Sequence, residues 1–234
     1  MTHTEPSPHD ARPTDDRAPD ETDEALPPEG LIDATIEAIE LAHPSIPLPS
    51  HSVEPPHRLS PVERFDDAVD RAFDRLRGTE PADRIMYALT ELGDFGLIWV
   101  LLGFGRGLRS DADATAAWRL AAALGVESVL LNGLIKSQFK RERPVTQAPR
   151  PYKMRIPLTT SFPSGHSSTA MLASLLLTQH SPRSVKPVYF GLAALVAASR
   201  VHVRIHHASD VVGGVAVGTV FGLVARKVWP LKKA

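Results

Sequence analysis

The chain has 234 residues, 43% of them hydrophobic, and no cysteine. Disulfide bonds, cysteine metal ligands and cysteine nucleophiles are therefore excluded, and the length fits one core domain with an additional segment. The net charge of −1 conceals an asymmetry, because residues 1–85 hold 20 acidic and 8 basic side chains whereas residues 86–234 hold 7 acidic and 18 basic ones.

Residues 1–60 form an acidic, proline-rich tail. Its first 30 residues contain almost no large apolar side chain and also lack the basic start and apolar stretch of a secretory signal. They cannot bury enough surface to offset the entropy cost of ordering, so we predict that they are disordered. Within the tail, residues 31–41 carry apolar side chains at helical spacing and predict a short amphipathic helix. The six prolines of residues 44–61 indicate a linker.

A helix start follows the tail. Ser60 has the character of a helix cap, with Pro61 at the first helical position and Glu63 at the third, and Gly78 is placed to end the helix. The apolar residues between them recur at helical spacing: Phe65, Val69, Phe73 and Leu76. We predict an amphipathic interfacial helix over residues 61–78 that lies along the membrane surface or packs on the core domain.

Five apolar segments make up most of the remaining chain. They cover residues 84–104, 113–135, 165–179, 185–199 and 209–229. A membrane-spanning helix needs about 20 predominantly apolar residues, and the charge-free runs here reach 15, as in Val211–Ala225. Each segment is nevertheless apolar nearly all round, and charges near the ends can snorkel or face the bundle interior. We therefore predict an all-α, membrane-embedded helical bundle of about five apolar helices; a soluble all-α domain is the alternative.

Glycines recur in the last apolar segment. Gly214, Gly218 and Gly222 are four residues apart and share one helix face. This spacing predicts close contact with a neighbouring helix.

The sidedness of such a bundle stays open. If all five segments cross the bilayer, the polar junctions after the second, before the third and between the last two lie on one face with the tail. The other face then carries much of the basic loop charge, which favours a cytoplasmic position for it. The acidic tail would then have to be translocated without a signal peptide.

The three polar junctions carry the candidate chemistry: residues 136–144, 161–167 and 199–210. In the second, Pro163 and Gly165 predict a tight turn before a helix, whose first N–H groups form an anion site beside His166.

In the third junction, His206 and Asp210 are four residues apart, so on a helix they would share a face. An imidazole held by a carboxylate has a fixed tautomer and a free nitrogen that can act as base or nucleophile. Taken alone, this stretch also fits a basic cap on a membrane helix. Together with Lys136, Arg143 and Arg200 as cations around an anion-binding turn, it predicts a site for a phosphoryl group.

The three junctions together resemble the type 2 phosphatidic acid phosphatase superfamily, which includes lipid phosphatases and vanadium haloperoxidases. The pattern is Lys-x6-Arg-Pro, then Pro-Ser-Gly-His, then Ser-Arg-x5-His-x3-Asp. It is matched by Lys136, Arg143 and Pro144, by Pro163, Ser164, Gly165 and His166, and by Ser199, Arg200, His206 and Asp210. The resemblance covers residues 84–229 and excludes the tail.

The resemblance implies roles for these residues. His206 is expected to be the nucleophile that forms a phospho-histidine, Asp210 to orient it, and His166 to be the general acid. The expected phosphate-binding residues are Lys136, Arg143, Arg200, Ser164 and Gly165. No metal or cofactor is expected.

The implied activity is that of a membrane phosphatase, a phosphoric monoester or diphosphate hydrolase. Its expected substrate is a lipid phosphate: phosphatidic acid, phosphatidylglycerophosphate or a polyprenyl phosphate or diphosphate. We expect an integral protein of the plasma membrane that binds no nucleic acid, and the oligomeric state stays open. A haloperoxidase or soluble acid phosphatase on the same scaffold is the first alternative, and a non-catalytic lipid-binding module is the second.

Other polar residues have simpler interpretations. We expect His202 and His207 to be structural or solvent-facing, although His202, His206 and Asp210 also have the spacing of a metal site, which the nearby cations oppose. The basic loop residues are expected to be interfacial: Lys140, Arg141, Arg150, Lys153 and Arg155. Three acidic residues are expected to make helix-packing contacts: Glu91, Asp94 and Glu127.

Overall fold

The computed structural model describes residues 59–146, 149–179 and 181–231. The disorder and the short helix predicted within the N-terminal tail lie outside these residues. Arg58–Ala234 forms one compact unit, and every regular element in its described part is helical. The prediction of an all-α fold is confirmed.

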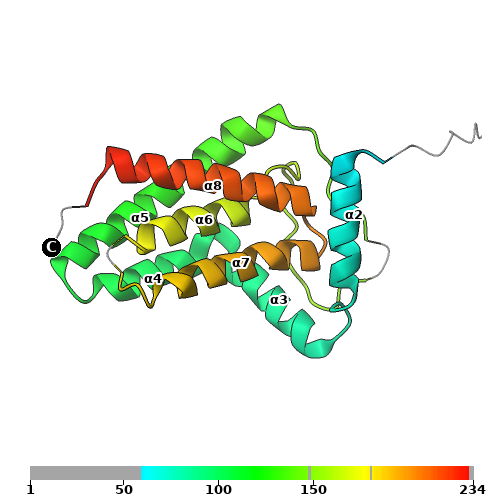
Figure 1. The fold of residues 1–234 in the computed structure, drawn as a ribbon, viewed down its shortest axis with the longest axis horizontal. Helices are drawn as coiled ribbons and strands as arrows, with labels where there is room; N and C mark the ends of the chain where they lie inside the picture. The colour runs from blue at the N-terminus through cyan, green and yellow to red at the C-terminus, as the bar shows by residue number, and fades with distance from the viewer. Residues whose placement is uncertain (1–58, 147–148, 180, 232–234) are drawn as a thin grey trace, which may run out of the picture. The chain divides into compact units, whose positions relative to one another are not determined.

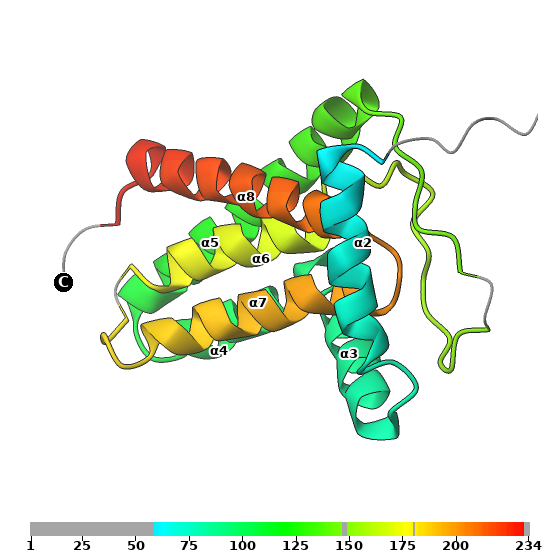
Figure 2. The same cartoon turned by 45° about the vertical axis from the view of Figure 1, so that its right-hand side comes forward.

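Seven α-helices make up the described unit. They are α2 (Pro61–Asp74), α3 (Glu80–Leu92), α4 (Leu97–Gly107), α5 (Asp111–Leu130), α6 (Gly165–Leu177), α7 (Lys186–His202) and α8 (Ala208–Val228). Helices α6, α7 and α8 run alongside one another, and α2 lies across the end of α7 and the start of α8 (Figures 1 and 2). This end of the bundle carries all three polar junctions.

Helix α2 starts as its sequence predicts. The Ser60 hydroxyl accepts a hydrogen bond from the Glu63 N–H at 3.2 Å, and the Ser60 N–H donates to the Glu63 carboxylate at 2.7 Å. The regular helix ends at Asp74, and Gly78 follows with a φ of +79°. The helix packs on the core domain, where its Asp66 is buried.

The first apolar segment is broken, so the single helix predicted over residues 84–104 is wrong. Helices α3 and α4 are bent by 63° at a short 3₁₀ turn, where Phe95 and Gly96 have φ values of +53° and +70°. The chain also passes close to α6 here, because a Cβ atom on Gly93 would lie 2.7 Å from the His166 ring. The break turns Asp94 towards His166 in the first turn of α6.

Two described helices are long and apolar enough to cross a membrane: Asp111–Gln138, which continues α5 through a π and a 3₁₀ turn, and Ala208–Val228. The bent pair α3–α4 is a third if it counts as one span. Helix α6 has 13 residues, which give about 20 Å against a bilayer core of about 30 Å. It is the most buried helix of the bundle, so its apolar character serves the core rather than lipid contact.

The glycines of α8 make the close helix contact that their spacing predicts. A Cβ atom on Gly214 or Gly218 would collide with the backbone of α6 at Ser164 or Ser168. At the end of this contact, the Ser164 N–H donates to the Asp210 carbonyl at 2.9 Å. The glycine face therefore holds the second and third polar junctions together.

Candidate active site

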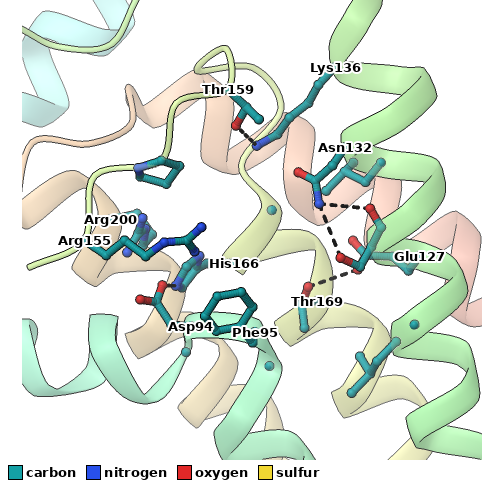
Figure 3. Close-up of a pocket in the computed structure, with 18 of the residues that line it drawn as sticks. Asp94, Phe95, Glu127, Asn132, Lys136, Arg155, Thr159, His166, Thr169 and Arg200 are labelled. Carbon is teal, nitrogen blue, oxygen red and sulfur yellow. Dashed lines mark hydrogen bonds and ion pairs between the residues drawn. The ribbon is translucent and has the colours of Figure 1, made fainter.

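A cavity of about 830 Å³ opens at the end of the bundle where the junctions meet (Figure 3). Residues from all three junctions line it: Lys136, Gly165, His166, Arg200 and His206. Its size is within the usual range of about 300–1,000 Å³ for small-molecule sites. The structure thus brings together side chains that are up to 70 positions apart in the sequence.

His206 lies in the loop between α7 and α8, so the predicted shared helix face of His206 and Asp210 is wrong. The two side chains still meet, because the chain turns sharply and His207 caps α8. The His206 Nδ1 atom lies 3.6 Å from an Asp210 carboxylate oxygen. The Ser161 hydroxyl donates to that carboxylate at 2.5 Å and lies 3.5 Å from Nδ1.

Asp210 is fully buried and held from several sides. One carboxylate oxygen accepts from the Ser161 hydroxyl and from the His207 N–H, the latter at 2.8 Å. The other accepts from an Arg141 guanidinium N–H at 2.6 Å, and Arg141 also pairs with Asp66 of α2 at 2.5 Å. The expectation that Arg141 is an interfacial side chain is therefore wrong, because it binds the carboxylate beside His206.

The surroundings of His206 keep its imidazole neutral. The pKa of His206 is lowered to about 3, chiefly by burial and also by the positive charges of Arg200 and Arg143, whereas Asp210 opposes the shift. A neutral imidazole held at Nδ1 has a lone pair at Nε2. An Arg143 guanidinium nitrogen lies 3.3 Å from that atom.

Two arginines bring buried donors to this site: Arg200 lines the cavity, whereas Arg143 does not line it and instead contacts His206. Arg200 is fully buried; one N–H donates to the Thr90 hydroxyl at 3.3 Å, and no described residue accepts from its Nε or its second terminal nitrogen. Arg143 donates to the carbonyls of Ile205, Thr159 and Thr160, and its buried Nε also has no acceptor in the described part. An unsatisfied buried donor costs about 1–3 kcal/mol, so these groups are suited to an anion.

Lys136 and the start of α6 complete the cationic wall. The Lys136 ammonium is buried and donates to the Thr159 hydroxyl at 3.2 Å. A Cβ atom on Gly165 would lie 4.0 Å from the ammonium nitrogen, so the first turn of α6 borders the same space. Ser164 does not line the cavity, since its N–H is bonded to α8 and its hydroxyl accepts from Ser167 at 3.0 Å.

His166 faces the cavity from the first turn of α6. Its Nε2 atom lies 3.0 Å from an Asp94 carboxylate oxygen and 3.1 Å from the Thr90 carbonyl (Figure 3). Asp94 was expected to make only a helix-packing contact, and its position on the cavity wall corrects that expectation. The carboxylate stabilises positive charge on this imidazole.

A comparison with known protein families identifies the family of this chain. The sequence profile of the PAP2 superfamily matches residues 116–233. This chain belongs to the PAP2 superfamily.

Two curated PAP2-like relatives have stated activities. Phosphatidylglycerophosphatase B of Bacillus subtilis (strain 168) is 29% identical over 169 residues, which cover 67% of this chain and 79% of that protein. Decaprenylphosphoryl-5-phosphoribose phosphatase of Mycobacterium tuberculosis (strain ATCC 25618 / H37Rv) is 28% identical over 140 residues, covering 60% and 76% respectively.

Two solved structures share the fold. A transmembrane PAP2-type phosphatidylglycerolphosphate phosphatase of Bacillus subtilis has a TM-score of 0.54 and 26% identity, and the match covers 73% of this chain and 87% of that one. LpxE of Aquifex aeolicus has a TM-score of 0.56 and 24% identity, covering 68% and 93%. This PAP2 protein is a membrane protein and a phosphoric ester hydrolase.

Two further residues of the PAP2 site stand out on the cavity wall. The Arg155 guanidinium carbon lies 4.7 Å from the centre of the Phe95 ring and lines the cavity beside Asp94, so the interfacial role expected for Arg155 is also incomplete. Glu127 of α5 is buried in the wall and accepts a hydrogen bond from the Thr169 hydroxyl at 3.0 Å. The sequence does contain a signal for the positions of Asp94 and Phe95: the Gly-Asp-Phe-Gly run at residues 93–96 breaks the helix beside the site.

The other two histidines of the described residues have structural roles. His202 is buried and its Nε2 atom lies 2.7 Å from an Asp83 carboxylate oxygen, away from the cavity, and His207 caps α8. The alternative ligand set of His202, His206 and Asp210 is therefore not assembled. In the described part of the chain, no group of three or more histidine and acidic side chains is placed to hold a metal ion.

Proposed function

We propose that this protein is a lipid phosphatase that transfers the phosphoryl group of an amphiphilic phosphate to His206 and then to water. One observation carries the proposal: a neutral imidazole shares a cavity with buried guanidinium N–H groups of Arg200 that have no acceptor among the described residues. Such donors match the equatorial oxygens of a transferred phosphoryl group, where the charge of the transition state is concentrated.

In the first step, Nε2 of His206 attacks phosphorus. A P–N bond forms while the bond from phosphorus to the leaving oxygen breaks, and His166 gives its proton to that oxygen. Asp210 keeps the remaining imidazole proton on Nδ1. In the second step, a water oxygen attacks phosphorus while the P–N bond to His206 breaks, and His166 accepts a proton from that water. Inorganic phosphate leaves, and His206 is again a neutral imidazole.

The proposed phosphate cradle consists of Lys136, Arg143 and Arg200 with the first-turn N–H groups of α6 at Gly165. Ser164 acts indirectly in this proposal, because it joins α6 to α8 through the carbonyl of Asp210.

Beyond the proposed phosphate cradle, the cavity has an apolar wall and one further cation, Arg155. Val100, Ala121 and Leu124 line it next to the polar end, which suits the tail or linker of an amphiphile. Arg155 stands beside Asp94 on the side of the proposed acid His166. The names of both curated relatives denote lipids that carry a lipid-linked phosphate as well as the phosphate that is removed. We therefore favour a lipid with a phosphorylated polar headgroup, such as phosphatidylglycerophosphate, over phosphatidic acid or a polyprenyl phosphate or diphosphate.

A phosphate-release assay tests the function. Detergent-solubilised protein in EDTA should release phosphate from one or more lipids of a panel: phosphatidylglycerophosphate, phosphatidic acid, and polyprenyl mono- and diphosphate. His206→Ala should abolish turnover, and an alkaline SDS quench of the wild-type reaction with ³²P-labelled substrate should trap a phospho-enzyme that is stable in alkali and labile in acid. Near-full activity of His206→Ala would overturn the assignment. Halide oxidation with vanadate but no phosphate release would support a haloperoxidase, and neither activity would support a non-catalytic module.

We also propose the plasma membrane as the location, because it contains glycerolipid and polyprenyl phosphates. Separation of membrane fractions, with detection of the protein by antibody, tests this.

A further inference from the structure

Helix α2 lies outside the part of the chain that matches the PAP2 profile, yet it contacts the loop that carries His206. Asp66, on the inner face of α2, is only 5% exposed. One of its carboxylate oxygens accepts from the Ser209 N–H at 2.7 Å. The other accepts from the Ser209 hydroxyl at 2.8 Å and from Arg141 at 2.5 Å. A carboxylate from one helix thus satisfies a first-turn N–H group of another, α8.

Arg141 continues this connection into the active site. Its second terminal nitrogen donates to the Asp210 carboxylate and to the Ser209 hydroxyl, each at 2.6 Å. One guanidinium fork therefore bridges the buried carboxylates of Asp66 and Asp210, a geometry that the point charge of a lysine does not reproduce. Asp210 in turn lies beside Nδ1 of His206.

From these contacts we propose that Asp66 is a positioning residue for the phosphatase reaction. Through Arg141 and Ser209 it fixes the first turn of α8, and with it the Asp210 carboxylate that orients His206. This inference rests on the proposed function, and it makes α2 a part of the catalytic apparatus. A displacement of about 1 Å of a reacting group can cost about 100-fold in rate, so a loosened Asp210 should be visible in kcat.

Other contacts of α2 and of the turn that follows it allow the positioning of Asp210 to be tested separately from the docking of α2 on the bundle. Arg77 donates to the carbonyls of Val201 and His202, each at 2.8 Å, and Asp74 pairs with Arg204 at 2.6 Å. The Arg77 contacts are made with the end of α7 and the Asp74 contact with the loop that follows it, and neither passes through Asp210. Breaking them tests docking without touching the connection from Asp66 to His206.

The experiment compares Asp66→Asn with Asp67→Asn and Asp74→Asn in the full-length protein in detergent. Asp67 is the exposed neighbour of Asp66, so it is a matched control for charge and helix position. Phosphate release from dioctanoyl phosphatidylglycerophosphate gives kcat and KM, and thermal unfolding gives the folded fraction. Asp66→Asn should lower kcat per folded molecule about 10- to 100-fold with KM within about twofold. Asp67→Asn should have the kcat and the folded fraction of the wild type. Asp74→Asn can have a lower folded fraction, but its kcat per folded molecule should be unchanged.

Arg141 provides the second arm. Arg141→Lys keeps the charge but loses the fork, so it should lower kcat as Asp66→Asn does, and this variant keeps the inference testable if Asp66→Asn does not fold. The double variant should be no slower than the slower single variant, because both changes break one connection. Three results would overturn the inference. In the first, the losses of kcat in the two single variants add up in the double variant. In the others, Asp66→Asn has the same kcat as Asp67→Asn, or loses as much kcat as Asp74→Asn. An active His206→Ala variant would contradict the proposed function itself. An inactive His206→Ala variant together with wild-type kcat for Asp66→Asn would contradict only the positioning role of Asp66.

Discussion

At the scale of single residues, burial and nearby cations both lower the pKa of His206, and Asp210 opposes them. The same cations that suit a phosphoryl group also disfavour a proton on the imidazole, because like charges repel. The site therefore keeps its proposed nucleophile unprotonated while it attracts an anionic substrate. Burial and the charge of Arg200 lower the pKa of His166 as well, whereas its partner Asp94 raises it and stabilises the proton that the proposed acid donates.

The first prediction concerns the protonation of His206. Because burial lowers its pKa to about 3, the imidazole should stay neutral as the pH falls from 7 to 4, a range in which a histidine with the ordinary pKa of about 6.5 becomes charged. Histidine ¹⁵N NMR, with the signal assigned through His206→Asn, measures this directly. A titration of the His206 signal near pH 6.5 would contradict the environment described here.

The second prediction concerns Arg155. Arg155→Ala should lower kcat/KM about tenfold for phosphatidylglycerophosphate, which presents a second phosphate to this side chain, and less than twofold for phosphatidic acid, which does not; a charge-assisted hydrogen bond contributes about 1.5–3 kcal/mol. Steady-state kinetics with the two lipids give the ratio. Lys153→Ala is the control, because Lys153 belongs to the same loop and does not line the cavity. Equal losses on both lipids would argue against a second phosphate contact.

At the scale of secondary-structure elements, the glycine face of α8 sets the distance between the second and third junctions. Because Gly214 and Gly218 have no side chain, α8 packs closely against α6, and the Ser164 N–H can donate to the Asp210 carbonyl. Helix α2 then closes the same end of the bundle from outside. Three elements thus determine the position of one loop, residues 203–207.

The third prediction follows from this packing. Gly218→Ala should destabilise the fold by about 1–3 kcal/mol, because the added Cβ atom would meet the backbone of Ser168. Gly191→Ala in α7 is the matched control; nothing lies within 4 Å of its Cβ position, and alanine should stabilise the helix by about 0.5–1 kcal/mol. Thermal unfolding in detergent distinguishes the two. A neutral Gly218→Ala variant would mean that α6 and α8 are further apart than described.

At the scale of the whole molecule, the distribution of apolar side chains fits a membrane setting. Trp118 of α5 is 76% exposed, and Phe104 and Val129 are also exposed, whereas Trp99 is fully buried in the core. Large apolar side chains on the outside of a helical bundle are expected to face lipid tails.

The fourth prediction tests this orientation. In liposomes, lipids brominated on their acyl chains should quench the fluorescence of Trp118, because the heavy atoms reach only side chains that face lipid. In a Trp229→Phe background, Trp118→Phe should remove most of the quenching and leave the emission of the buried Trp99. Quenching that is unchanged in Trp118→Phe would show that this face of α5 does not contact the acyl chains.

The sequence by itself determined the helical class, the start of α2, the glycine face of α8 and the three motifs that meet in the cavity. These features are local: they depend on residue type and on neighbours three or four positions away, which a helix brings together. The predicted contact of His206 with Asp210 used the same local rule, and there the chain leaves the helix and makes the contact through a loop.

Only the tertiary structure decided the partners of that contact. Arg141 and Ser161 reach Asp210 from distant parts of the chain, and Asp66 is connected to it through Arg141. Asp94 reaches His166 because α3 and α4 are bent. No spacing rule relates such residues, since their proximity depends on how whole helices pack. Charged side chains in loops and tails look alike in a sequence, and burial against a partner is what separates Asp66 from its exposed neighbour Asp67.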